Sequence, residues 1–392
     1  DITVSGALSW SANQLTLFAT RKLQINAGLT ITGTGALHAA FGQGTTDGSG
    51  SSYTVADGVS LKIPLPTGSQ TTATTAFTWQ KGSNGTVNQL VLNNGYLSFG
   101  TINGGAQNAP AAANTAAVNP QGLLTQPNYF DNVTTGRNGY YKLTYFNYPL
   151  NLEIGTGAGG SRWNGNTTFV STQGGTYTPQ SGGYLEISGY RPGVGSGPGG
   201  GPKGSGVIES VVPITIGVGG SPALITNQYS LGSSDSFLEA TTSIRATTAT
   251  LQNVGLWTGT QDDWVGATDS PTKTLGTLTG SGFTAISTVG SPANVLRVDE
   301  VSGATSGASV LFYSTDSSVR GTHASCCSFT NATSVNPASA TIQVTGDGSY
   351  ALYNSLGNID PGSEAGFTWY YTAAPAATIN SVIQDEIGRA HV

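Results

Sequence analysis

The chain has 392 residues, enough for two domains with separate cores, and only 9% of them are charged. The net charge is −6, and no basic cluster is present that would contact phosphates, so we expect no nucleic-acid partner. Apolar runs are far shorter than the ~20 residues of a membrane-spanning helix, so we expect no transmembrane segment. Long amphipathic helical stretches are also absent, and the sequence therefore predicts an all-β protein.

Residues 2–41 contain two copies of one strand pattern, offset by 21 residues and then by one residue more. Apolar residues alternate with Ser, Thr, Asn or Gln in both copies. The matched apolar pairs are Ile2/Leu23, Val4/Ile25, Leu8/Leu29, Trp10/Ile31, Leu15/Leu37 and Leu17/Ala39. Such a repeat is typical of a β-solenoid, in which each coil buries its inward residues only against the next coil. We therefore predict a right-handed parallel β-helix over residues 1–105, as the end of a longer solenoid.

Three segments carry a family resemblance: DITVSGALSWSANQLTL at 1–17, INAGLTITGTG at 25–35 and KGSNGTV at 81–87. This first quarter of the chain resembles the filamentous-haemagglutinin type of bacterial surface exoprotein. The resemblance implies a large exported protein of the bacterial cell surface. The chain lacks Met and its last residues, 386–392, can be written as a translated sequencing adapter. We therefore expect an internal fragment from environmental DNA and exclude residues 386–392 from the fold prediction.

The residue composition and the strand pattern change after residue 105. Residues 107–120 are small, uncharged and bracketed by prolines, which predicts a linker or exposed loop over residues 106–126. Residues 127–379 contain longer and more aromatic strands at short intervals, without the earlier repeat. This pattern predicts an antiparallel β-sandwich.

The stretch 257–269 is the densest group of candidate functional residues. Its carboxylates could hold Ca²⁺ through oxygen ligands, or its indoles could stack on a sugar. The plainer alternative is a strand–loop corner in which aspartates form turns and tryptophans pack in the core. The candidate ligand-binding residues are Trp257, Asp262, Asp263, Trp264 and Asp269, and the candidate calcium ligands are Asp262, Asp263 and Asp269.

The adjacent residues Cys326 and Cys327 form the second candidate site. They can form a disulfide, bind a metal together with His323, or remain two buried thiols. A disulfide is chemically allowed in a secreted protein, whereas a structural zinc site usually needs a second spaced pair of ligands.

A third stretch, residues 193–206, is rich in glycine around Lys203. Its residue order does not fit the phosphate-binding Walker pattern, which requires glycine directly before the lysine. The sequence predicts a flexible loop here.

No nucleophile motif is present, and the charged residues of the first hundred positions are scattered rather than clustered. We therefore predict a structural and adhesive, non-enzymatic cell-surface protein, located outside the cell. Its expected partners are host-cell or environmental glycans or surface proteins, bound through the β-sandwich. The alternative is a carbohydrate-active enzyme or carbohydrate-binding module that acts on polysaccharide, since a glycosidase needs only two carboxylates that the fold brings together.

Overall fold

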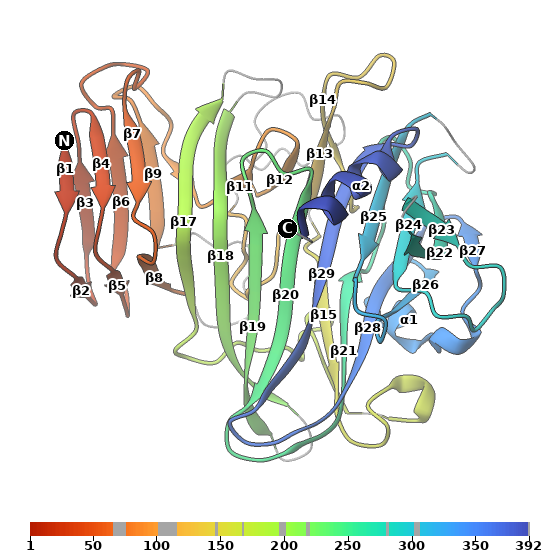
Figure 1. Cartoon of the computed structure of the whole chain (residues 1–392). Coiled ribbons are helices and arrows are strands. Elements are labelled where there is room, and N and C mark those ends of the chain that lie inside the picture. Colours follow the sequence, from red (N-terminus) through yellow and green to blue (C-terminus); the bar gives the residue numbers. More distant parts are fainter. Residues whose placement is uncertain are drawn as a thin grey trace.

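The computed structural model describes residues 1–65, 76–100, 116–145, 148–166, 168–195, 201–216, 220–279, 282–301 and 306–390. It is nearly all β, with 53% strand and 5% helix, and contains several sheets (Figure 1). The prediction of an all-β protein is confirmed. Within the ranges just given, the structure has two α-helices, α1 (Phe329–Ser334) and α2 (Ile379–Ala390).

The amino-terminal strands form parallel ladders whose register follows the sequence repeat. Ile2 pairs with Leu23, Leu8 with Leu29 and Leu15 with Leu37. In the described residues, the ladders are β1 (Ile2–Val4), β4 (Lys22–Ile25) and β7 (Ser52–Val55); β2 (Leu8–Trp10), β5 (Leu29–Ile31) and β8 (Ser60–Pro64); and β3 (Gln14–Phe18), β6 (Ala36–Phe41) and β9 (Phe77–Lys81). Leu23, Ile25, Leu29 and Ile31 are at most 1% exposed, because each copy covers the apolar residues of its neighbour.

The ladders continue directly into the large antiparallel sheet. Strand β8 pairs with β17, with Leu61 opposite Ile187, so one sheet crosses the predicted domain boundary. Figure 1 shows the ladders standing beside this sheet at one end of the molecule. From β8, the hydrogen-bonded order is β17 (Tyr184–Gly195), β18 (Gly201–Ile216), β19 (Ser221–Leu231), β20 (Phe237–Ala246), β29 (Glu364–Pro375), β25 (Ala308–Tyr313), β24 (Val295–Asp299) and β22 (Thr272–Thr279), which also pairs with β23 (Gly282–Ala285) and β27 (Gln343–Thr345).

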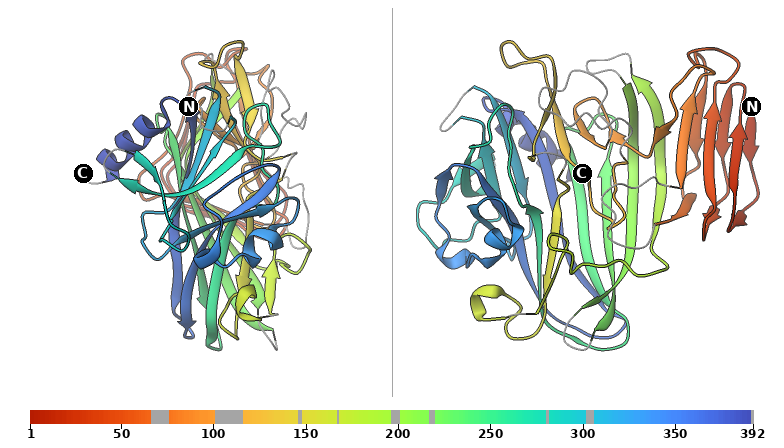
Figure 2. Two further views of the ribbon diagram at one scale, coloured as in Figure 1. Left: turned by 90° about the vertical axis from the view of Figure 1, so that its right-hand side faces the viewer. Right: turned by 180° about the vertical axis from the view of Figure 1, so that it is seen from behind.

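A second antiparallel sheet faces the first in a sandwich-like arrangement, visible in both views of Figure 2. Its order is β16 (Phe169–Ser171), β15 (Asn151–Gly155), β21 (Leu251–Thr260), β28 (Gly348–Ile359) and β26 (Arg320–Ser325). Aromatic side chains fill the space between the sheets: the ring centroids of Phe312 on β25 and Tyr350 on β28 are 5.9 Å apart. The smaller strands are β10 (Asn88–Gln89), β11 (Leu92–Asn93), which pairs with β18, β12 (Leu97–Phe99), β13 (Pro127–Asp131) and β14 (Gly139–Lys142).

Two local predictions differ from the structure. Of the predicted linker, residues 106–115 lie outside the described residues, but Ala117, Val118 and Leu124 are fully buried in the core. These residues are apolar, and the bridge between Val118 and Leu124 satisfies backbone groups, so they pack rather than form an exposed linker. Of the glycine-rich stretch predicted as a loop, residues 196–200 lie outside the described residues, and the residues on either side form the paired ends of β17 and β18, with Gly193 opposite Lys203.

Helix α2 packs on one face of the large sheet, over β24, β25 and β29. Ile379 and Ile383 are fully buried and pack with Val295, Leu311 and Tyr370. The pattern of apolar residues four apart gives this segment one buried face. The sequence analysis predicts no helix here, and residues 386–390, excluded from the fold prediction, form the last part of α2.

Candidate functional site

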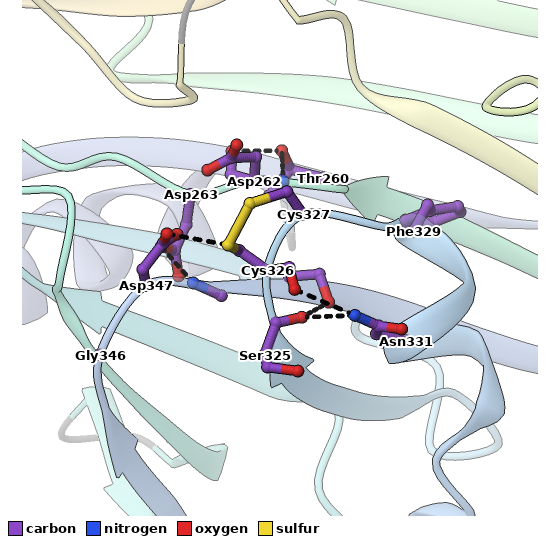
Figure 3. Close-up of a disulfide and its surroundings, with 12 residues drawn as sticks. Thr260, Asp262, Asp263, Ser325, Cys326, Cys327, Phe329, Asn331, Gly346 and Asp347 are labelled. Atoms are coloured by element: carbon purple, nitrogen blue, oxygen red, sulfur yellow. Dashed lines mark hydrogen bonds between the residues drawn. A yellow bond between two sulfur atoms is a disulfide. The ribbon is translucent and has the colours of Figure 1, made fainter.

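The candidate site lies at one end of the second sheet, where strands β21 and β26 end and strand β28 begins. Thr260 at the end of β21 is opposite Tyr350 near the start of β28, and Ser325 at the end of β26 is opposite Gly348. The residues that adjoin these strand ends therefore meet at the same end of the sheet. Figure 3 shows this convergence, with Asp262, Asp347 and the Cys326–Cys327 pair around one point.

Three carboxylates lie at this end of the sheet: Asp262, Asp269 and Asp347, called here the carboxylate cluster. One carboxylate oxygen from each lies within 4.8 Å of the others. Asp262 is only 4% exposed, and the Oδ1 atoms of all three residues are buried without a hydrogen-bond partner. Buried, unpaired carboxylate oxygens at this separation are costly unless a proton or a cation lies between them. Oxygen ligands of this kind suit a hard cation such as Ca²⁺.

The loop that carries Asp269 is held by several contacts. The indole Nε1 of Trp264 donates to the carbonyl of Gly266 at 2.9 Å, and Val265 bridges to Thr268. The backbone N–H of Ala267 donates to a carboxylate oxygen of Glu300 at 3.0 Å, and Glu300 is itself paired with Arg137. These contacts fix the loop before any ligand binds.

Asp263, predicted as a ligand, points away from the cluster. Its carboxylate forms a buried ion pair with Lys273, and it also accepts a hydrogen bond of 3.1 Å from the N–H of Gly348. Its bonding capacity is used within the fold, so we remove Asp263 from the candidate ligands. Asp347, which the sequence analysis did not single out, takes its place.

Trp257 also lies away from the cluster, and its assignment as a ligand platform is corrected. Its side chain is fully buried on the face of the second sheet that helix α1 covers, in contact with Phe329 and Ala332. The ring of Tyr353 lies 4.6 Å from it, between centroids. A ring buried in this way cannot stack on a sugar.

Trp264 is only partly buried, so part of its side chain reaches the surface. Its ring lies 5.7 Å from that of Tyr145, and the ammonium of Lys142 lies 3.6 Å from the centroid of the Trp264 ring. Burial lowers the pKa of Lys142, while the nearby charges of Asp269 and Asp262 favour its charged form. An aromatic pair and an ammonium group therefore adjoin the carboxylate cluster.

The structure joins Cys326 and Cys327 in a disulfide, and no free cysteine remains. Sγ of Cys326 lies 2.8 Å from Oδ2 of Asp347, so the disulfide borders the carboxylate cluster (Figure 3). His323 is not part of this group: its side chain is 6% exposed and lines a cavity of about 330 Å³, which Asp347 also borders. Burial lowers the pKa of His323 to about 4, which keeps the ring neutral.

The carboxylate cluster is predicted to make the stability of the folded protein depend on pH. Burial, together with Asp347 and Asp269, raises the pKa of Asp262 from 3.8 to about 7. The folded state therefore holds this proton more tightly than the unfolded state, and stability is lost as pH rises from about 4 to about 7. We expect the calcium-free protein to melt at a lower temperature at pH ~8 than at pH ~5, and Asp262→Asn to reduce this difference. Asp57→Asn, at an exposed turn, is the control; an unchanged pH dependence in Asp262→Asn would contradict the assignment.

No known protein family matches the sequence, and neither does any curated protein. A solved structure described as a kojibiose phosphorylase from the human microbiome matches with a TM-score of 0.35 and 9% identity, over 77% of this chain and 32% of that one. The GH36 α-galactosidase AgaA from Geobacillus stearothermophilus matches with a TM-score of 0.27 and 9% identity, over 59% and 30% of the two chains. The α-galactosidase from Lactobacillus brevis matches with a TM-score of 0.32 and 9% identity, over 74% and 40%.

These structural neighbours correct the functional prediction. The prediction of a structural and adhesive, non-enzymatic protein is contradicted: the matching structures named above are carbohydrate-active enzymes and not haemagglutinin-like adhesins. This chain spans between 30% and 40% of the length of the neighbours named above. At these TM-scores the likeness assigns neither an activity nor a substrate to this chain. Among the described residues, no helix is both long enough and apolar enough to cross a membrane.

Proposed function

We propose that the chain is a carbohydrate-recognising module that binds saccharide beside a calcium ion held by the carboxylate cluster. The observation that carries this proposal is the convergence of Asp262, Asp269 and Asp347, with buried and unpartnered oxygens, next to the rings of Trp264 and Tyr145. A calcium ion at the cluster would neutralise the carboxylates and keep coordination positions for sugar hydroxyls. Aromatic rings supply the apolar surface on which the C–H face of a sugar packs.

The proposal predicts that Trp264→Ala lowers saccharide affinity. We expect a glycan array to give binding by the wild-type protein with calcium, and a loss of about tenfold or more in Trp264→Ala, because aromatic anchors carry much of the binding free energy. Tyr184→Ala is the matched control, since Tyr184 is a partly buried ring on β17 that contacts Lys62. Equal glycan binding by Trp264→Ala and the wild type would refute the assignment of this ring.

A second candidate function is glycoside cleavage at the same cluster. The pKa of about 7 for Asp262, beside other carboxylates, is what a general acid needs near neutral pH. Turnover of a polymeric glycan by the wild type, with a loss of about 10²-fold or more in Asp262→Asn, would support cleavage over binding.

We also propose that residues 1–105 are a right-handed parallel β-helix and that residues 127–379 are a β-sandwich, which share one sheet through the pairing of β8 with β17. The parallel register of the ladders supports the first part. The likeness of the first quarter to filamentous-haemagglutinin proteins stays a prediction, and concerns that segment alone. We further propose an extracellular location at the bacterial surface, supported by the disulfide, because disulfides persist in oxidising compartments.

A further inference from the structure

The disulfide and the carboxylate cluster share one residue, Asp347. The ligand atoms of Cys326, Cys327 and Asp347 lie within 4.8 Å of one another, as do those of Asp262, Asp269 and Asp347. In the oxidised protein each sulfur is bonded to the other sulfur, so only the carboxylates can bind a cation. In the reduced protein the same position would offer two thiolates and a carboxylate.

We propose that Cys326, Cys327 and Asp347 form a redox-dependent site for a thiophilic divalent cation such as Zn²⁺ or Cd²⁺, which opens when the disulfide is reduced. Thiolate ligands select cations of this class, whereas carboxylates alone favour harder ions. The site would therefore change its preferred metal with the redox state of one bond.

A second observation points to a ligand at this position. Asp262 is 4% exposed, and its Oδ1 lies without a hydrogen-bond partner, turned toward Asp347. This buried oxygen beside the sulfurs has no hydrogen-bond donor, so it favours a cation and can supply a further oxygen ligand. The buried oxygen of Asp262 lacks a partner whether or not the protein binds saccharide, so this observation does not depend on the proposed function.

The surrounding contacts keep the two cysteines in place after the S–S bond breaks. The N–H of Cys326 donates to the carbonyl of Asp347 at 3.3 Å. The side-chain amide of Asn331 donates to the carbonyls of Ser325 and Cys326, each at 3.1 Å. None of these bonds involves sulfur, so reduction leaves the turn attached to β28. Cys327 is exposed, and a reductant can therefore reach the bond.

The chemical step balances with a water-soluble phosphine as reductant. The S–S bond breaks, phosphorus is oxidised to the phosphine oxide with the oxygen of a water molecule, and the two sulfurs take up two protons as thiols. Binding of the divalent cation then displaces those protons.

The test compares cadmium binding by the oxidised and the reduced protein, with the phosphine removed under anaerobic conditions. We expect the reduced protein to bind a single Cd²⁺ with thiolate-to-metal charge-transfer absorption and release of about two protons, and the oxidised protein to show neither. Asp347→Asn should weaken cadmium binding by the reduced protein about 10–100-fold, and the control Asp57→Asn should not.

Three results would overturn the proposal: no charge-transfer absorption in the reduced protein, equal cadmium affinity in Asp347→Asn and the wild type, or loss of cooperative melting on reduction. Saccharide binding is measured on the oxidised protein with calcium, and cadmium binding on the reduced protein. A negative result for saccharide binding therefore does not affect the cadmium proposal, and a negative cadmium result does not affect the saccharide proposal.

Discussion

Calcium is expected to raise the melting temperature of the oxidised wild-type protein by several degrees, and Asp347→Asn is expected to remove this effect. A cation that binds only the folded state at one hundred times its Kd adds about 2.7 kcal/mol to the free energy of unfolding. The physical reason is the neutralisation of buried carboxylate oxygens that no donor satisfies. Differential scanning calorimetry with calcium and with chelator measures the shift.

The matched variants make this result specific. Asp263→Asn removes a carboxylate that lies next in sequence but pairs with Lys273, so it should lower stability while the calcium shift persists. Asp57→Asn should leave both quantities unchanged. A melting temperature that does not respond to chelator in the wild type would count against the calcium site.

Leu29→Asp is expected to destabilise the amino-terminal ladders by more than about 4 kcal/mol, because it buries an unpaired charge. Leu29 is 1% exposed on β5, between Leu8 of the preceding copy and Leu61 of the following one. Urea unfolding followed by circular dichroism measures the loss. Since β8 pairs with β17, we expect the damage to reach the large sheet as well.

Leu8→Asp is the control for this substitution. It occupies the same register position one copy earlier, but Leu8 is 44% exposed on the outer strand β2. Its cost should stay near 1 kcal/mol or less. Equal destabilisation by both variants would contradict the stacking of successive copies.

The strand repeat could be predicted from the sequence because it is local and periodic. Each apolar residue has its partner a fixed 21 or 22 positions further on, so the register of Ile2 with Leu23 and of Leu15 with Leu37 follows from inspection. The pairing of β8 with β17 could not be predicted in this way. It joins residues more than a hundred positions apart and leaves no periodic signal.

The carboxylate cluster was predicted in part for the same reason. Asp262 and Asp269 lie in one acidic loop, whereas Asp347 reaches them only through the pairing of β21 with β28. Asp262 and Asp263 are adjacent in sequence, but their side chains point to different places. Asp262 lies in the carboxylate cluster, and Asp263 pairs with Lys273. The burial of Trp257 depends on helix α1, which covers that face of the sheet from a distant part of the chain.

The most direct test of the calcium-assisted saccharide site is a crystal structure of the oxidised protein grown with calcium and an array-selected glycan. The account predicts an anomalous peak within coordination distance of Asp262, Asp269 and Asp347, with the sugar against Trp264. Crystals with the glycan bound elsewhere and no metal among these three carboxylates would contradict it.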